Sequence, residues 1–275
     1  MAAEHIARQF EDRDFLVTVQ QLKAGATGPE GDFDMLLLLY PVYAFRAPEL
    51  VLAWLKNLPS TAEGKRAAVI SVSGGGEMSP NTACRAQSIN ILERKGFLVD
   101  YENMLVMPSN IAVPTKAPLD RMLLDVLPKK TERIVLELCN GTVRRTIPHG
   151  LDKALAAMGG MEKYGAHLFG KRIRVADSCN GCGLCESGCP SGNIHMVGNR
   201  PAFSGKCLLC MHCMYCCPKK ALRPGVGKMA MLKGGFDLDV LALTPAPAPL
   251  TAEELAKLAP GIAWSAVRDY ILDKR

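Results

Sequence analysis

The sequence that decides the fold of this chain is Cys-Asn-Gly-Cys-Gly-Leu-Cys-Glu-Ser-Gly-Cys-Pro at residues 179–190, followed by Cys-Leu-Leu-Cys-Met-His-Cys-Met-Tyr-Cys-Cys-Pro at 207–218. Both copies have the spacing C-x2-C-x2-C-x3-C-P. Three cysteines spaced in this way bind three corners of one four-iron cluster, whereas the fourth, beside its proline, binds the other cluster. The doubled pattern therefore predicts two [4Fe–4S] clusters that exchange their fourth ligands.

The ligands follow from this rule. The first cluster is expected on Cys179, Cys182, Cys185 and Cys217, and the second on Cys207, Cys210, Cys213 and Cys189. Cys216 is left over. Structural zinc sites more often use two C-x2-C pairs separated by a longer loop, and disulfides are typical of secreted chains with a signal peptide, which is not recognised here. We therefore favour iron–sulfur clusters over zinc or disulfides.

The repeat continues past the cysteines, because Pro-Ser-Gly-Asn-Ile at 190–194 corresponds to Pro-Lys-Lys-Ala-Leu at 218–222. Proline suits the first turn of a helix, so a short helix is expected after each proline. Residues 179–222 resemble the bacterial two-cluster ferredoxin domain, an electron carrier. The side chains of Met211, His212, Met214 and Tyr215 are expected to pack around the second cluster and exclude water.

Length and charge limit the remaining classes of function. The chain has 275 residues and a mass of 29.7 kDa, enough for one ordinary domain beside the cysteine-rich segment. A formal net charge of +6 does not predict nucleic-acid binding, and Lys171, Arg172 and Arg174 fit a solvated face as well as a docking patch. The longest apolar stretch, 35–43, is too short to span a membrane, and a cytoplasmic location is expected.

The N-terminal half alternates predicted strands and helices. Strands are expected at 15–22, 33–40, 67–73, 97–101 and 104–108, with helices at 2–10, 48–57 and 80–95. The runs 33–40 and 67–73 are almost continuously apolar, as in parallel strands buried on both faces. This alternation predicts an α/β domain with a doubly wound parallel sheet.

The apolar run at 34–43, the Ala68–Gly76 run and the tandem cysteine motif together resemble ferredoxins that carry an N-terminal flavodoxin-like domain. The resemblance extends to about residue 235. It implies a redox protein of a mostly anaerobic, cytoplasmic family, with an FMN-type domain at 1–169, a small α+β two-cluster domain at 170–227 and a tail at 228–275.

The same resemblance implies two loops beside a flavin ring. These loops contain Pro41, Val42, Tyr43 and Ala44, and Ser73, Gly74, Gly75 and Gly76. Tyr43 is expected either to stack on the flavin or to cap the sheet edge, and the glycines either to admit the ring or to form a plain turn. A flavodoxin also has a first strand and a phosphate-binding loop before its first helix, and this sequence starts inside that helix. We expect that strand and loop about 15 residues upstream of Met1.

The rest of the chain is expected to be mainly helical. Helices are predicted through 117–170 with a bend at Gly159-Gly160, and Thr-Pro-Ala-Pro-Ala-Pro at 244–249 is an extended linker. Thr251 and Glu254 form a predicted capping box, and a last helix contains Trp264, Val267 and Ile271. This tail is expected to dock a partner or to cover apolar surface of the chain itself.

These features predict an electron carrier without catalytic residues that exchanges single electrons with a separate reductase or dehydrogenase, either directly or through a flavin in the flavodoxin-like domain. Two alternatives remain. The first is an FMN-dependent reductase that collects electrons from the clusters for a small substrate. In the second, the flavodoxin-like half lacks a cofactor and only presents the ferredoxin to its partner.

Overall fold

A parallel sheet forms the centre of the N-terminal half. The computed structural model describes residues 1–29, 31–61, 64–111, 113–115 and 117–274. Strands β1 (Met35–Pro41), β2 (Arg66–Ser73) and β3 (Leu98–Val106) are parallel and lie in the order β1-β2-β3. In the register, Leu38 lies beside Val69 and Ile70 beside Asn103. This arrangement confirms the α/β class with a parallel sheet.

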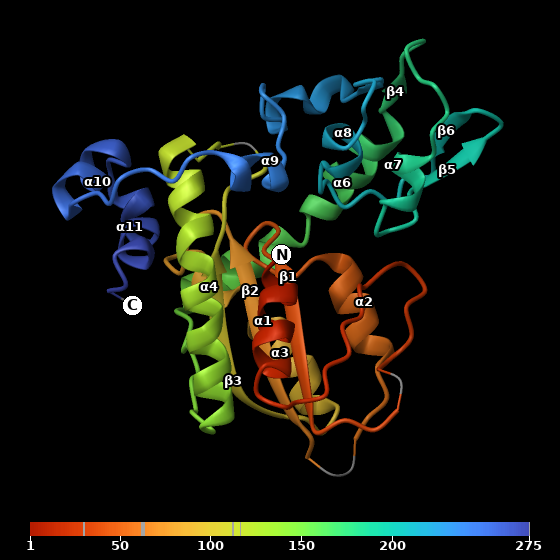
Figure 1. Cartoon of the computed structure of the whole chain (residues 1–275). Helices are drawn as coiled ribbons and strands as arrows, with labels where there is room; N and C mark the ends of the chain where they lie inside the picture. Colours follow the sequence, from red (N-terminus) through yellow and green to blue (C-terminus); the bar gives the residue numbers. More distant parts are fainter. Residues whose placement is uncertain (30, 62–63, 112, 116, 275) are drawn as a thin grey trace.

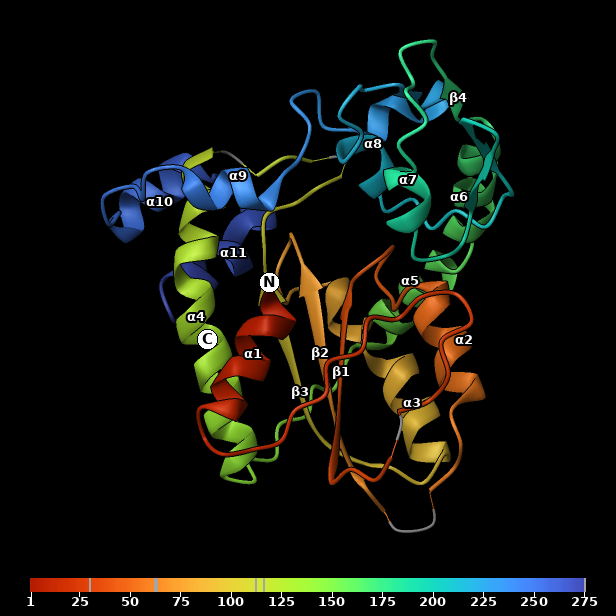
Figure 2. The same cartoon turned by 45° about the vertical axis from the view of Figure 1, so that its right-hand side comes forward.

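Helices cover both faces of the sheet, as Figure 2 shows. On one face α2 (Glu49–Asn57) and α3 (Ala86–Arg94) pack on Ala67 and Val69 of β2. On the other, α1 (Ala2–Glu11) and α4 (Ala117–Cys139) pack on Ala68 and Ile70. Successive strand residues point to opposite faces, so one apolar run supplies both cores. We call residues 1–159, together with the C-terminal helix α11 described below, the sheet unit.

Three secondary-structure predictions for the sheet unit were wrong in detail. Residues 15–22 form no strand, because they pair with no other strand, and Leu16 is fully exposed although Val17 and Leu22 pack against the apolar clusters. The segments at 97–101 and 104–108 are one strand, β3, since the polar Glu102 between them is buried in an ion pair with Arg85. The expected helix at 80–95 begins with a 3-10 turn, η1 (Asn81–Ala83).

The cysteine-rich segment folds beyond the carboxyl ends of the strands (Figure 1). It follows α5 (Gly150–Gly159) and α6 (Glu162–Lys171), which meet at the predicted Gly159-Gly160 bend. It contains the short helices α7 (Leu184–Ser187) and α8 (His212–Tyr215), the antiparallel pair β4 (Arg174–Val175) with β7 (Leu222–Arg223), the antiparallel pair β5 (Ile194–Val197) with β6 (Arg200–Phe203), and the 3-10 turn η2 (Gly225–Ala230). We call residues 162–235 the module.

Helix positions within the module differ from the prediction. Only turns follow Pro190 and Pro218, and the short helices α7 and α8 instead begin among the cysteines. The reason is that the chain leaves each turn directly into an extended segment, β5 or β7. Residues 117–170 are also not helical throughout, because α4 ends at Cys139 and an extended segment precedes α5.

The tail returns to the sheet unit. It forms α9 (Leu238–Leu243), α10 (Ala252–Leu258), η3 (Ile262–Trp264) and α11 (Ser265–Ile271). The predicted capping box is present at the start of α10. Val267 and Tyr270 are buried in the same core as α1 and α4, so the tail covers apolar surface of its own chain. In the described residues, no helix is long and apolar enough to cross a membrane.

Candidate metal centre

Four cysteines from both copies of the motif line one cavity in the module. Cys179, Cys182 and Cys185 come from the first copy, and Cys217 comes from the second. The chain turns tightly here, since Gly181 and Gly183 have left-handed φ angles of 69° and 76°. A side chain at Gly181 would meet the Asn199 carbonyl oxygen at 2.8 Å. The geometry thus brings together the four cysteines that spacing assigns to one cluster.

The other four predicted ligands also lie near one another. The pKa of Cys207 is raised to about 11, mainly by burial and in smaller part by the neighbouring thiols of Cys210 and Cys189. The pKa of Cys213 is raised by burial and then by Cys210, Cys207 and Cys189. Cys189 therefore faces the cysteines of the other copy, 18 or more residues away in sequence.

Backbone N–H groups point at the sulfur of both proline-flanked cysteines. The N–H of Asn193 donates to Cys189 Sγ, and the N–H of Ala221 donates to Cys217 Sγ, each at 3.3 Å. Both donors lie four residues after their acceptor, so the two copies repeat one local geometry. Leu209 N–H also donates to Cys207 Sγ at 3.3 Å. Such hydrogen bonds favour the thiolate and raise the reduction potential of a bound cluster.

The remaining residues between the ligands are mostly packing residues. Met211 and Met214 are buried, whereas His212 is exposed and lies against Gly188. Cys216 lies near both groups, because burial and the thiols of Cys185 and Cys217 raise its pKa, and Cys216 in turn contributes to the raised pKa of Cys213. Its Sγ donates a weak hydrogen bond to the Cys213 carbonyl oxygen at 3.8 Å.

The chemistry of this donor set suits an iron cluster. Among the described residues, no group of three or more His, Cys, Asp or Glu side chains has the geometry to hold a metal ion. The eight thiols instead lie in two groups, and burial raises the pKa of Cys185 in one group and of Cys207, Cys210 and Cys213 in the other, which disfavours ionisation of these four. A cationic metal core removes that penalty, because coordinated thiols lose their protons. The residues present therefore fit two thiolate-bound clusters.

The loops predicted to flank a flavin lie at the carboxyl end of the sheet, but other parts of the chain pack against them. A Cβ added to Gly74 would lie 2.8 Å from Ser109 Cβ, and one added to Gly76 would lie 2.9 Å from Ala266 Cβ of α11. Ser73 Oγ accepts hydrogen bonds from Gly75 N–H and Asn81 Nδ2, both at 3.1 Å. The triglycine is a packed turn.

The other predicted flavin loop is directed at the module. Val42 N–H continues the sheet by donating to the Val72 carbonyl, after the exposed Pro41. Tyr43 exchanges two backbone hydrogen bonds with Arg46, and burial raises its pKa, with the thiols of Cys210 and Cys207 adding to the effect. A Cβ on Gly159 of α5 would collide with the carbonyl oxygen of Ala44. Because neither loop leaves a cradle open, these residues do not fit a flavin.

Several contacts between module and sheet unit had no signal in the sequence. Asn110 Nδ2 donates to the Cys210 carbonyl oxygen at 3.4 Å, and Tyr215 Oη donates to the Asn110 carbonyl at 2.8 Å. Ala24 N–H donates to the Pro190 carbonyl at 2.7 Å. These partners are about 100 or more residues apart, and spacing patterns do not report such distant contacts.

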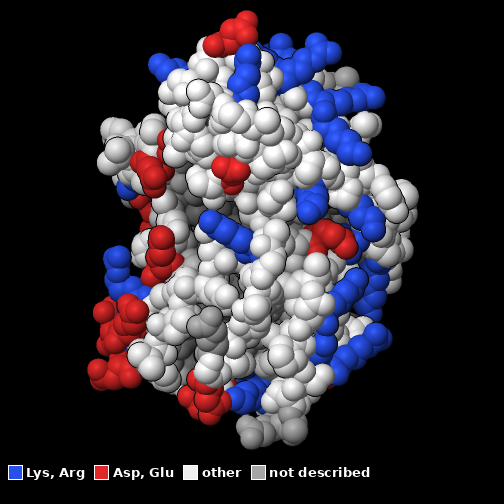
Figure 3. Space-filling view, turned by 90° about the vertical axis from the view of Figure 1, so that its right-hand side faces the viewer, with Lys and Arg blue, Asp and Glu red and all other residues white. Residues whose placement is uncertain are grey.

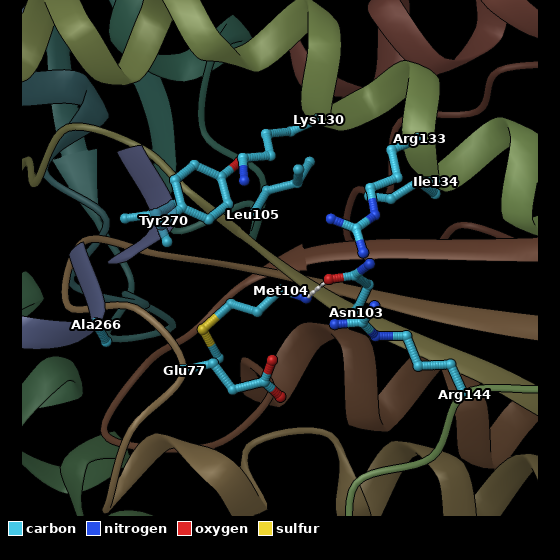
Figure 4. A pocket seen from close by; sticks show the side chains of 11 residues that line it. Glu77, Asn103, Met104, Leu105, Lys130, Arg133, Ile134, Arg144, Ala266 and Tyr270 are labelled. Carbon is cyan, nitrogen blue, oxygen red and sulfur yellow. Dashed lines mark hydrogen bonds between the residues drawn. The ribbon is translucent and has the colours of Figure 1, made fainter. Parts of the chain in front are cut away.

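A second cavity lies between β3, α4 and α11 and contains no predicted site residue (Figure 4). Its charged side chains already have partners. Lys130 Nζ lies 2.6 Å from Asp273 Oδ1, and Arg133 Nε lies 2.9 Å from Glu137 Oε1. We assign no function to it.

No model of a known protein family matches the chain, and no curated protein matches it significantly.

Proposed function

We propose that this chain is a one-electron transfer protein whose module holds two [4Fe–4S] clusters. The observation that carries the proposal is the cavity lined by Cys179, Cys182 and Cys185 of one motif copy and by Cys217 of the other. Chain crossing of this kind is what the C-x2-C-x2-C-x3-C-P spacing requires of a two-cluster domain.

The residues of the module would hold the clusters and tune them. When bound, each cluster supplies a centre that takes up or releases one electron. The thiolates fix it in place, and the N–H groups of Asn193 and Ala221 favour the anionic sulfur of Cys189 and Cys217. The buried side chains of Met211 and Met214 limit access of water. No acid, base or nucleophile is needed for electron exchange.

In this proposal the sheet unit supports the module. Asn110 and Ala24 hydrogen-bond the module at the carboxyl ends of the strands, where ligands of parallel sheets usually bind. Because Ser109 and Ala266 fill the space at the triglycine turn, the proposed path of the electron does not include a flavin. This arrangement favours the presenting role of the flavodoxin-like half over a flavin-dependent reductase.

The test begins with metal analysis of anaerobically purified protein. We expect about eight irons and eight sulfides per chain and no FMN released on denaturation. Zinc in place of iron would contradict the proposal. Released FMN would instead support the reductase.

Ligand variants then test the crossing. Cys179→Ala and Cys207→Ala define the spectroscopic signature of losing the first and the second cluster. Cys189→Ala should give the Cys207→Ala signature, although Cys189 is closer in sequence to Cys185. Cys216→Ala is the matched control and should keep full iron content. The opposite signature for Cys189→Ala would refute the crossed assignment.

A further inference from the structure

The module carries an excess of positive charge that the rest of the chain lacks. Of the 33 Lys and Arg residues, ten lie between residues 171 and 233, whereas only two of the 27 Asp and Glu residues, Asp177 and Glu186, do. The remainder of the chain has more acidic than basic residues. Figure 3 shows Lys and Arg at the top and upper right of one face, at the level of the module, and further Lys and Arg down the same edge. The net charge of the protein is therefore concentrated there.

Most of these cations have no acidic partner. On β4 and β7, Arg174 lies directly opposite Arg223, and both are exposed. Like charges at facing strand positions destabilise the pair. Within the part of the module that the structure describes, the single ion pair joins Arg200 to Asp177 at 3.3 Å. The fold does not neutralise this charge, so it is available to another molecule.

The charge lies at the cavity of the first cysteine group. Lys219 lines that cavity and Lys220 follows it, and both are exposed. Cys182 is exposed as well, and the neighbouring Leu184 is 49% exposed. The second group, in contrast, faces the sheet unit, since the Cys210 carbonyl is bonded to Asn110. An electron leaving the protein would therefore leave through the first group.

We propose that this basic face docks an acidic redox protein, which exchanges one electron with the cluster on Cys179, Cys182, Cys185 and Cys217. The inference rests on the proposed function. The reduced centre loses one electron and is oxidised, and the same electron reduces the other centre. No bond is made or broken. Coulombic attraction steers the acidic partner to Lys219 and Lys220, and Leu184 provides an apolar contact beside the cluster. The patch suits a redox protein better than a nucleic acid because Lys219 lines the cysteine cavity itself.

The first experiment measures oxidation of the dithionite-reduced protein by three small acceptors. These are anionic hexacyanoferrate(III), a neutral quinone and cationic hexaamminecobalt(III), and each molecule of the metal complexes takes one electron. With wild-type protein, rising salt should slow oxidation by the anion, speed oxidation by the cation and leave the quinone unchanged. The double variant Lys219→Glu, Lys220→Glu should lose or invert these slopes.

The matched control reverses the same number of charges elsewhere. Lys56 lies in the last turn of α2 and Arg94 is the last residue of α3, and both are exposed. The double variant Lys56→Glu, Arg94→Glu should keep the wild-type slopes. If both double variants behave alike, net charge and not this face controls the rate, and the proposal is wrong.

The second experiment measures binding without electron transfer. A fluorescent glutamate-rich peptide should bind the iron-loaded protein, and Lys219→Glu, Lys220→Glu should weaken it about tenfold or more while the control variant does not. Preferential binding of a short DNA duplex to the same lysines would overturn the proposal. The proposal would also be wrong if the Lys219→Glu, Lys220→Glu variant lost iron but bound the peptide as the wild type does, because the two lysines would then only balance the charge of the cluster. Wild-type protein purified without iron would refute the proposed function itself. Measuring the iron content therefore separates that outcome from a failure of the docking proposal.

Discussion

The sheet unit and the module differ in whether their arginines have acidic partners. In the sheet unit Arg85 is fully buried, and its guanidinium binds Glu77, Glu102, Ser71 and Thr146. In the module the cross-strand pair of Arg174 and Arg223 has no acid between its members. The sheet unit has two large apolar clusters, whereas the apolar cluster around the cysteines of the module contains five buried residues. The sheet unit is stabilised by its own packing, and in the proposed function the bound clusters stabilise the module.

The largest predicted effect follows removal of iron. A chelator applied anaerobically should unfold the module, because five buried side chains cannot replace two clusters. We expect backbone hydrogen exchange in β5 and β6 to accelerate about a hundredfold or more, with β2 unchanged. Mass spectrometry of exchange resolves the two regions. If β5 and β6 stay protected without iron, the module folds by itself and the comparison fails.

Next in size is truncation of the buried arginine. Arg85→Ala removes the partner that lies 2.6 Å from Glu102, which is 3% exposed, and leaves this carboxylate with Arg145 at 3.5 Å. Removing one partner of a buried ion pair costs about 3–5 kcal/mol of unfolding free energy, and the remaining arginine places the expected loss at the lower end of that range. Guanidinium titration followed by tryptophan fluorescence measures the loss. The exposed Arg94→Ala is the control, with a change below about 0.5 kcal/mol. Equal effects would show that the buried network stabilises nothing.

A smaller effect depends on pH. Burial raises the pKa of Asp120 to about 6, and a hydrogen bond with Thr115 offsets only part of the shift. The folded-state pKa lies above the unfolded one, so the ionised carboxylate destabilises the fold, with the cost growing from about pH 4 to pH 6. Asp120→Asn should therefore stabilise the protein, and the gain should rise by about 1 kcal/mol between pH 5 and pH 8. A gain that does not change with pH would contradict this origin.

The smallest predicted effect is in the module. Arg174→Glu replaces a repulsion with an ion pair to Arg223 and should stabilise the module by about 0.2–1 kcal/mol. Thermal loss of cluster absorbance reports it, and Arg174→Gln separates relief of repulsion from pairing. The same change removes charge from the proposed docking face, so peptide binding should weaken as stability rises. If stability falls, the pair of arginines is not strained.

Local patterns predicted much of the molecule. The apolar run at 67–73 contains side chains for both faces of the sheet, so it was enough to predict a buried parallel strand. The capping box of Thr251 and Glu254 needs only three residues of context. Spacing also predicts how the cysteines are grouped, since three ligands of each group lie within one copy and the fourth is assigned to the other copy, and this ligand set remains a prediction.

The errors arose where distant parts of the chain decide the outcome. Phe15, Leu16 and Val19 have strand-like composition but find no neighbouring strand, and all three remain exposed. The flavin loops were predicted from a resemblance, and their surroundings depend on Ser109 and Ala266. Propensity and spacing do not encode which segment fills a given space.

The return of α11 to the sheet unit bears on synthesis at the ribosome. Val267 and Tyr270 complete a core whose other members, such as Ile6 and Leu123, emerge long before them. All cysteines of the module are translated in the interval, at a time when that core is still open on one side. Domains usually fold in the order in which they leave the ribosome, but here the first unit closes last. A nascent chain stopped after the module would therefore expose the apolar surface that α11 covers, and it would be a natural target for chaperones and proteases.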